Sequence, residues 1–297
     1  MISVAIPYHG NRSKWTLQTV VNASAVSAVK EIIITIDPSN TDPKKFMQTL
    51  RSYRKVRVYQ NDKRLFVFRN KVNAVSKCTQ PWVALIDSDN IAGAGYYGAF
   101  SKQRKNPNIL YQPSIGHTMI HYEEYIGEDI NLKWAAKHID EVKVNMMLNT
   151  MNYMFYRETW LKALKSAIES DYDPLTADSA FINYTCLKSG MMMHIIPGME
   201  YMHTVHPVVE NLEVQSTYRI YAQDAEREYA KIIKQLKESL NENPTDSRSL
   251  PSGGQKSVSE ASNWSGSGRP SRRVLQSSED RKGEADILPG EMDDLSD

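Results

Sequence analysis

Two aspartates separated by a single residue, Asp87 and Asp89, directly follow a run of apolar residues at positions 82 to 86. An unpaired carboxylate in an apolar core costs on the order of several kcal/mol, so both side chains are expected to face solvent or a cation. In proteins, Mg²⁺ and Mn²⁺ are commonly held by one or two carboxylates together with phosphate oxygens and water. The triplet therefore predicts a divalent metal site beside a phosphorylated ligand, and the alternative is that both aspartates cap the following turn.

Strand and helix patterns alternate along the first half of the chain and determine where this triplet lies. Runs of β-branched and apolar residues occur at 2–6, 31–36, 56–59 and 82–86, and helical patterns lie between them at 13–28, 44–53 and 66–77. This alternation is typical of an α/β fold with a mostly parallel sheet flanked by helices. Ligands of such open sheets bind at the carboxyl ends of the strands, which is where Asp87 is expected.

The second half of the chain has a less regular pattern. Strands are predicted at 109–112, 152–156 and 192–196, and helices at 130–137, 158–170, 177–189 and 215–240. Composition then changes, because Ser, Gly, Pro and charged residues dominate the rest of the chain. Such a segment buries too little apolar surface to offset its backbone entropy. We therefore predict one domain over residues 1–240 and a disordered low-complexity tail over residues 241–297.

Bulk properties exclude several classes of function. A formal net charge of +1 over 297 residues provides no global attraction for nucleic acid or for an anionic membrane. No apolar run approaches the roughly 18 residues that span a bilayer, and the first residues are typical of a strand rather than of a signal peptide. Cys78 and Cys186 are expected to be reduced core thiols. A cytoplasmic location, without a transmembrane segment, is the expectation.

Several motifs, taken in their order along the chain, are similar to those of one enzyme family. They are Val4-Ala5-Ile6-Pro7-Tyr8, Ile33-Ile34-Thr35-Ile36-Asp37, the spaced Asn61, Arg69-Asn70, Ala74, and Val83-Ala84-Leu85-Ile86-Asp87-Ser88-Asp89-Asn90. This set resembles the inverting family 2-type glycosyltransferases, which have a GT-A fold that is Rossmann-like. The resemblance extends over roughly residues 1 to 95, is thinner over 145 to 206, and does not include the tail.

The resemblance implies a binding role for residues of the first half. It places Pro7 and Tyr8 at the nucleotide-binding turn, Asp37 against the base, and Asp87 against the ribose or sugar of the donor. Asn61 and Arg69 match further donor-site positions, and a guanidinium is a natural diphosphate ligand. Simpler alternatives are that Pro7 only ends the first strand and that Asp37 caps the turn after the second strand.

The resemblance also assigns the metal ligands and the catalytic base. Asp89 is the expected ligand of Mn²⁺ or Mg²⁺, with His203 preferred and His206 a close second to complete the shell. Asp178 matches the catalytic base, Asp173 is the alternate base, and helix capping is the competing explanation for Asp178.

These features predict a metal-dependent enzyme that moves a sugar from a nucleoside-diphosphate sugar to an acceptor hydroxyl of a glycan or other molecule, with inversion. A nucleotidyltransferase is an alternative, although the stretch after the first strand contains a single glycine, Gly10, where a triphosphate loop would need more. A non-catalytic nucleotide-sugar-binding scaffold that recruits partners through its tail is the third hypothesis.

Overall fold

The computed structural model describes residues 1–10, 12–38, 43–117, 120–170, 172–174, 177–204 and 212–241. All of these residues belong to one compact unit, Met1–Thr245. Residues 242–297, which contain nearly all of the predicted tail, lie outside the described part of the chain.

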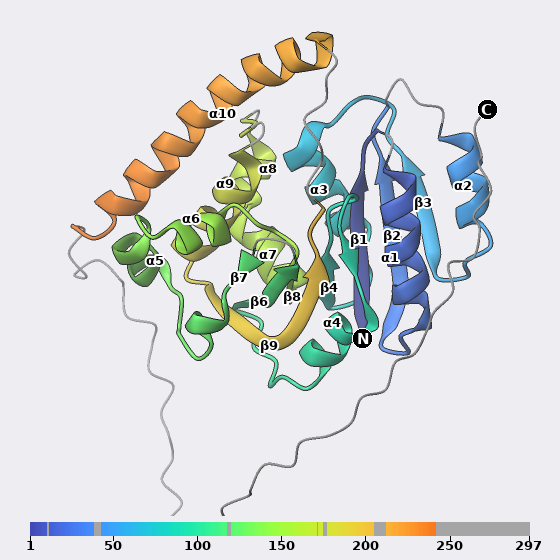
Figure 1. The fold of residues 1–297 in the computed structure, drawn as a ribbon, viewed down its shortest axis with the longest axis horizontal. Helices are drawn as coiled ribbons and strands as arrows, with labels where there is room; N and C mark the ends of the chain where they lie inside the picture. The colour runs from blue at the N-terminus through green and yellow to red at the C-terminus, as the bar shows by residue number, and fades with distance from the viewer. Residues whose placement is uncertain are drawn as a thin grey trace, which may run out of the picture. The chain divides into compact units, whose positions relative to one another are not determined.

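A sheet of nine strands runs through the described residues (Figure 1). Its order is β3-β2-β1-β4-β8-β6-β9-β5, with β7 paired to β6. The strands are β1 (Ile2–Tyr8), β2 (Val29–Ile36), β3 (Val56–Gln60), β4 (Trp82–Leu85), β5 (Ile91–Ala92), β6 (Ile109–His117), β7 (Ile120–His121), β8 (Met154–Tyr156) and β9 (Met192–Met202). The pairs β1·β2, β1·β4, β2·β3 and β6·β9 are parallel. The pairs that involve β5, β7 and β8 are antiparallel, so the expected parallel sheet forms the first half and a mixed sheet forms the second.

The pairing register brings the predicted site residues to one edge of the sheet. Ala5 pairs with Leu85 and Tyr8 pairs with Ile36, so β1, β2 and β4 have their carboxyl ends at this edge. Asp37 and Asp87 follow those ends. The fold thus confirms the prediction that the aspartate triplet lies where α/β sheets bind ligands.

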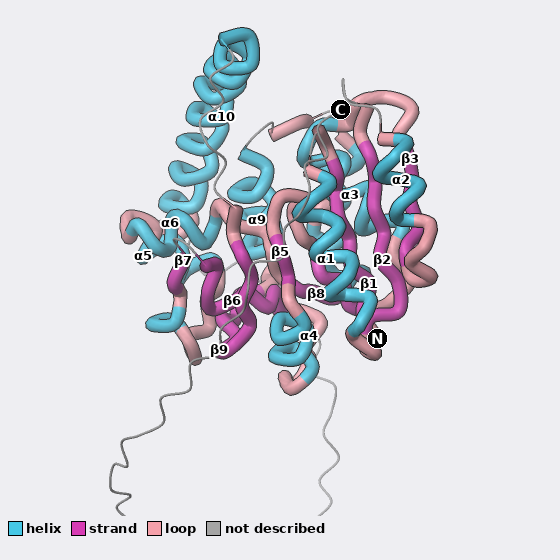
Figure 2. Tube along the Cα trace, turned by 45° about the vertical axis from the view of Figure 1, so that its right-hand side comes forward, coloured by secondary structure: helices cyan, strands magenta, loops and turns pink. Residues whose placement is uncertain are grey.

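Helices cover both faces of this sheet. They are α1 (Ser13–Ala25), α2 (Lys44–Leu50), α3 (Phe66–Lys77), α4 (Ala94–Ser101), α5 (Leu132–His138), α6 (Val142–Leu148), α7 (Arg157–Ala163), α8 (Lys165–Glu169), α9 (Asp178–Lys188) and α10 (Leu212–Glu238), with a 3-10 turn at Glu123–Tyr125. Figures 1 and 2 show α1 and α3 on opposite faces of β1 and β2. The long α10 packs along α5 and α9 (Figure 1).

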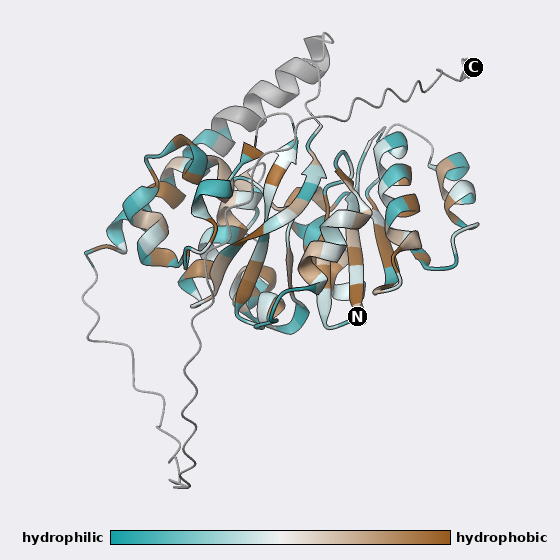
Figure 3. Cartoon of the chain, turned by 60° about the horizontal axis from the view of Figure 1, so that its bottom comes forward, coloured by the Kyte–Doolittle hydropathy of each residue, from teal (hydrophilic) through white to brown (hydrophobic). Residues whose placement is uncertain are grey.

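The core consists of the strands and the helix faces that cover them, where apolar residues concentrate (Figure 3). On α1 the buried residues are Thr16, Thr19, Val20 and Ala23, which recur at helical spacing on one face. Both cysteines are free and buried, as predicted. Within the described residues, no helix is both long and apolar enough to span a bilayer.

Three local features differ from the sequence-based expectations. β1 does not end before Pro7 but continues to Tyr8, and Pro7 pairs with Thr35 of β2. Its missing N–H is tolerated because β4 pairs with β1 only as far as Ala5. The helix expected over residues 158–170 is divided at Leu164 into α7 and α8. The unpredicted α4 contains two glycines in eight residues, which weakens any helical pattern in the sequence.

Candidate active site

The Asp87-Ser88-Asp89-Asn90 turn is held in place by α1. The Asn90 amide donates to the Asp87 carbonyl at 2.9 Å, which closes the turn. The Thr16 hydroxyl donates to the Ser88 carbonyl at 2.8 Å, and the Thr19 hydroxyl donates to the Asn90 carbonyl at 2.9 Å. Because both threonines are fully buried, these bonds fix the backbone of the turn while leaving the two aspartate side chains to other partners.

A buried lysine joins Asp87 to Asp178. Nζ of Lys71, on α3, lies 3.1 Å from Oδ1 of Asp87 and 2.8 Å from Oδ2 of Asp178. The lysine side chain is 3% exposed, the Asp178 side chain 7% and the Asp87 side chain 26%. The cluster is therefore closed on the Lys71 and Asp178 side and open to ligands on the Asp87 side.

The charges in this cluster change the proton affinities of its members. Burial lowers the pKa of Lys71, but the carboxylates of Asp178 and Asp87 outweigh burial and raise it above its usual value. Burial raises the pKa of Asp178, and Lys71 opposes that rise. Lys71 is thus a permanent cation, and Asp178 is a carboxylate with increased proton affinity, a property that suits a general base.

Asp178 is the first residue of α9, and the helix starts without a side-chain cap from the preceding Ala177. Its carboxylate pairs with Lys71, so the cluster gives it a partner that helix capping does not require. The alternate base, Asp173, lies in the described segment 172–174, and its side chain is partly exposed. The structure thus brings Asp178, and not Asp173, into the ion-pair cluster with Asp87.

Asp89, on the other side of the turn, pairs with a cation from α1's preceding loop. Its Oδ2 lies 3.1 Å from a guanidinium nitrogen of Arg12, which also contacts the Ser88 hydroxyl at 3.4 Å. The Asp89 side chain is 14% exposed. The guanidinium shows that this carboxylate faces a position where a positive charge is accepted.

His203 lies near the same turn. β5 pairs antiparallel with the end of β9, Ile91 with Met202, and the next residue pair outward is Asn90 with His203. The Thr204 amide donates to Asn90 Oδ1 at 3.0 Å, which ties this segment to the turn. Nδ1 of His203 also contacts the Tyr201 hydroxyl at 3.3 Å. The other expected metal ligand, His206, lies outside the described residues.

These residues fit a cation that is completed by its ligand. Among the residues that the structure describes, no three His, Cys, Asp or Glu side chains converge on a common point. A carboxylate and an imidazole near one turn are nevertheless the donor types that Mn²⁺ accepts, and Mg²⁺ and Mn²⁺ sites at nucleotides take their remaining oxygens from phosphate and water. The Asp89 and His203 pair therefore fits a metal that binds together with a diphosphate.

A chain of amides forms the site beyond Tyr8. The Asn61 side chain donates to Asp37 at 2.7 Å and to Asn70 at 3.0 Å, and the Asn73 side chain donates to Asn61 at 2.8 Å. Both Asp37 oxygens also accept from the Leu65 amide at 3.1 Å. The buried Asp37 thus fixes the loop between β3 and α3 and closes the floor of the site.

Tyr8 and Arg69 have partners within the protein. The Tyr8 ring stacks on Phe46 with centroids 4.7 Å apart, and the Tyr8 carbonyl accepts from the Asp37 amide at 3.1 Å. Arg69 donates to the Ser170 carbonyl at 2.6 Å and so anchors the segment that leads to α9. The donor contacts predicted for these two residues stay predictions.

The family of the chain follows from comparison with known proteins. The sequence profile described as "Glycosyl transferase family 2" matches residues 3–164, which is more than half of the chain. The chain belongs to glycosyl transferase family 2. It is a glycosyltransferase, and the matched region contains both aspartates of the triplet, Arg12 and Lys71, whereas Asp178 lies beyond it. No protein with a curated description matches the sequence.

Solved structures share the fold of this glycosyltransferase at low sequence identity. *Staphylococcus aureus* TarS residues 1–349 in complex with UDP is 13% identical with a TM-score of 0.53, covering 81% of this chain and 70% of that one. The same TarS segment in complex with UDP-GlcNAc is 10% identical, with a TM-score of 0.53 and coverage of 81% and 71%. GalNAc-T7 with UDP, GalNAc and Mn²⁺ is 15% identical, with a TM-score of 0.51 and coverage of 85% and 52%. These likenesses confirm the GT-A fold.

Sequence reasoning missed two charged residues of the glycosyltransferase site, Arg12 and Lys71. Lys71 had a recognisable signal, because Phe68 and Val75, three residues before and four residues after it, are apolar and define the buried face of α3. A lysine on the apolar face of a predicted helix needs a buried anion, and the next strand ends in one. Arg12 had no such signal, since it lies in a loop.

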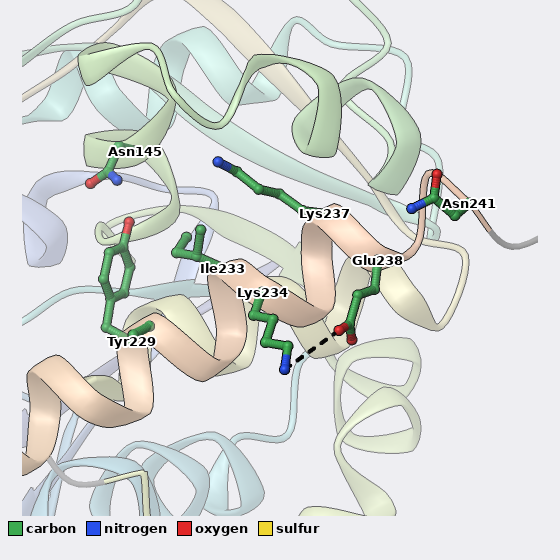
Figure 4. A pocket seen from close by; sticks show the side chains of 8 residues that line it. Asn145, Tyr229, Ile233, Lys234, Lys237, Glu238 and Asn241 are labelled. Carbon is green, nitrogen blue, oxygen red and sulfur yellow. Dashed lines mark ion pairs between the residues drawn. The ribbon is translucent and has the colours of Figure 1, made fainter.

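A cavity of about 540 Å³ lies elsewhere, along α10 (Figure 4). Tyr229 and Ile233 of α10 face Asn145 of α6 there, and Lys234 pairs with Glu238 at its rim. None of its lining residues belongs to the cluster around Asp87. The aromatic residues of the acceptor half are also mostly core, since Tyr96, Tyr97, Tyr153, Phe155 and Trp160 are buried.

Proposed function

We propose that the chain transfers a sugar from a nucleoside-diphosphate sugar to an acceptor hydroxyl with inversion, in a reaction that requires Mn²⁺ or Mg²⁺. The observation that carries this proposal is the pairing of Asp87 and Asp178 through Lys71, at the carboxyl end of β4 in a family 2 chain. It places a donor-side carboxylate and a buried carboxylate of raised pKa within reach of one nitrogen. We assign this activity to the domain formed by residues 1–240.

The donor is proposed to lie along the carboxyl ends of β1, β2 and β4. Structures of similar fold hold UDP or UDP-GlcNAc, which supports a nucleotide sugar as the donor. Pro7, Tyr8, Asp37 and Asn61 would bind the nucleoside from the floor of the site. Arg69 would contact the diphosphate with guanidinium N–H groups other than those that hold Ser170.

Asp89 and His203, with His206 as a further candidate, would hold the cation against the donor diphosphate. A bound Mn²⁺ or Mg²⁺ neutralises the charge that develops on the leaving diphosphate. Arg12 would then give up its contact with Asp89 and would be placed to pair with a phosphate oxygen. Support for Mn²⁺ comes from GalNAc-T7, whose structure contains that ion.

Asp178 would act as the general base. The acceptor hydroxyl oxygen forms a bond to C1 of the sugar while the bond from C1 to the diphosphate oxygen breaks on the opposite face. The hydroxyl proton passes to the Asp178 carboxylate, and the electron pair of the broken bond leaves with the diphosphate. Attack from the face opposite the leaving group inverts the configuration at C1.

The test uses the full chain with UDP-GlcNAc as the probe donor. We expect UDP release that depends on Mn²⁺, that stops with EDTA and that falls by a factor on the order of 10² or more in Asp89→Ala. Asp178→Asn should lose transfer by a similar factor on the order of 10² while it still binds UDP in the presence of Mn²⁺. Asp129→Asn, at a side chain that is 72% exposed, is the matched control and should keep full activity.

The two alternative functions give different results in the same assay. A nucleotidyltransferase would consume a nucleoside triphosphate and release pyrophosphate, and a scaffold would bind UDP without turnover. Metal-independent turnover, or full activity of Asp89→Ala, would refute the proposed role of the cation. A donor panel is needed if UDP-GlcNAc itself gives no shift in thermal stability, because a bound donor at about 100 times its Kd should stabilise by about 2.7 kcal/mol.

A further inference from the structure

Lys71 connects two carboxylates that come from different parts of the fold. Asp87 follows β4 in the donor half, Asp178 begins α9 in the acceptor half, and Lys71 extends between them from α3. Each carboxylate contributes an oxygen within 3.1 Å of the same nitrogen. A single ammonium group therefore sets the spacing between the carboxylate that would touch the donor and the one that would touch the acceptor.

Structural demand alone does not explain a lysine at this position. The side chain is fully buried among apolar neighbours of α3 such as Phe68 and Val75. A buried ion cluster is often no more stable than apolar residues of similar volume, and removing one partner is costly because a charge is left unpaired. A methionine at position 71 with an asparagine at position 178 would fill this space without any ion pair at that end.

We propose that Lys71 is a positioning residue that joins Asp87 to Asp178 and keeps the Asp178 carboxylate ionised and aimed at the acceptor side. This inference rests on the proposed function, because it assumes that Asp178 is the base. Lys71 itself touches neither donor nor acceptor and moves no proton. It acts through the two carboxylates that it holds.

The electrostatics of the cluster agree with this geometry. The groups that influence Asp178 are Lys71 from α3, Asp87 from the end of β4, its own helix amide at Ser179, and the Tyr153 hydroxyl beside β8. Burial and Asp87 both raise the pKa of Asp178, whereas Lys71 and the amide lower it. Burial also raises the pKa of Tyr153 well above its usual value, so that hydroxyl is neutral. Loss of Lys71 would remove the main group that keeps Asp178 charged.

The experiment compares kcat/KM as a function of pH for the wild type, Lys71→Met and Lys71→Arg, with UDP-GlcNAc, Mn²⁺ and a hydroxyl acceptor found in the donor assay. If no transfer acceptor is found, water as acceptor in donor hydrolysis gives the same profile. In Lys71→Met the acidic limb should move to higher pH by about one unit or more, because a neighbouring cation typically lowers a carboxyl pKa by 1–3 units. Activity near neutral pH should therefore fall by about tenfold or more and recover as the pH rises.

Two controls separate this effect from misfolding. Lys71→Arg keeps the charge and should retain the wild-type acidic limb even if its rate is reduced. Lys77→Met removes a charge from the same helix at an exposed position and should change neither rate nor profile. A misfolded variant would not regain activity at higher pH, and thermal unfolding of each variant identifies one that fails to fold.

The outcomes distinguish this inference from the proposed function. Full transfer by Asp178→Asn would refute the base and the proposed function together. Loss of transfer in Asp178→Asn with an unshifted acidic limb in Lys71→Met would refute the role of Lys71 alone. If Lys71→Met fails to fold, the double variant Lys71→Met/Asp178→Asn removes the unpaired charge, and the profile of Lys71→Arg decides: an acidic limb displaced like that of an uncharged site refutes the inference.

Discussion

Gly116 of β6 and Tyr201 of β9 are strand partners, and a Cβ atom on Gly116 would lie 2.9 Å from the Tyr201 ring. Such a distance is too short for two carbon atoms in contact. The glycine thus provides the space that the buried Tyr201 ring occupies, and the hydroxyl of that ring contacts His203 at 3.3 Å. A small residue on β6 therefore helps to set the position of a proposed metal ligand.

Gly116→Ala should displace the Tyr201 ring and with it His203. Overpacking of this kind costs about 1–3 kcal/mol, and a shift of about 1 Å in an active-site group can reduce the rate by as much as 10²-fold. We expect weaker Mn²⁺ binding, measured by calorimetry in the presence of UDP, and a reduced thermal midpoint. Gly98→Ala in α4 is the control, since nothing lies within 4 Å of its added Cβ. Unchanged Mn²⁺ affinity in Gly116→Ala would contradict the prediction.

Arg12→Gln should strengthen the binding of Mn²⁺ to the donor-free enzyme. The Arg12 guanidinium lies 3.1 Å from the Asp89 carboxylate, so it competes with an incoming cation. Removal of one positive charge at this distance is expected to raise the affinity by roughly fivefold to tenfold at low ionic strength. Titration followed by Mn²⁺ paramagnetic resonance measures it. Lys14→Gln, which removes the same charge from an exposed site two residues away, should have little effect, and equal gains in both variants would count against the competition.

Glu31 should make stability depend on pH at the end of the sheet opposite the site. Burial alone would raise its pKa, but hydrogen bonds from the Ser3 hydroxyl, the Thr79 amide and hydroxyl, and the Gln80 amide outweigh burial and lower it. A lowered folded-state pKa gives stability that is present above the unfolded-state value of about 4.5 and is lost as the pH falls through the folded value.

Glu31→Gln should therefore unfold more easily at neutral pH, by about 1–3 kcal/mol, because buried donors lose a charged acceptor. The difference from the wild type should shrink as the pH is lowered below about 4.5. Chemical denaturation between neutral and acidic pH measures this, and transfer activity at neutral pH should be unchanged. A difference that stays constant with pH would show that the carboxylate charge is not the source of the stability.

Thr16→Val should damage the aspartate turn without emptying the core. Valine has nearly the same shape but cannot donate to the Ser88 carbonyl, which Thr16 now does at 2.8 Å. A lost hydrogen bond of this kind costs about 1 kcal/mol of stability, and the freed turn should lower kcat/KM by about tenfold. Thr16→Ser keeps the hydroxyl and should retain activity. Equal loss in both variants would indicate that the methyl group, rather than the hydrogen bond, holds the turn.

Much of the fold could be predicted because local patterns and tertiary packing agree in the first half. The helix predicted over residues 66–77 matches α3 in full, and the strand before Asp87 ends one residue earlier than expected. The strand predicted at 192–196 continues to Met202 as β9, because pairing with β6 and β5 extends it beyond the Pro197-Gly198 turn signal. Such extensions depend on distant partners, and local sequence does not reveal them.

The candidate site was predictable at the level of residue types but not of pairings. Asp87, Asp89 and Asp178 could be named from their motifs, and the structure places Asp87 and Asp178 on one lysine. The partners Lys71 and Arg12 are 16 and 77 residues from the carboxylates that they pair with, so no local pattern connects them. The roles proposed for the site residues await the variants described above.

The two cysteines offer a practical advantage for such experiments. Cys78 and Cys186 are the chain's full complement of thiols, both are buried, and burial raises the pKa of Cys78 to about 12 and that of Cys186 also above its usual value. Thiolates react with maleimides and thiols do not, so the native protein should resist such labels. A cysteine introduced on the surface of α10 or α4 would then carry a fluorophore at a single known position, with no native residue replaced.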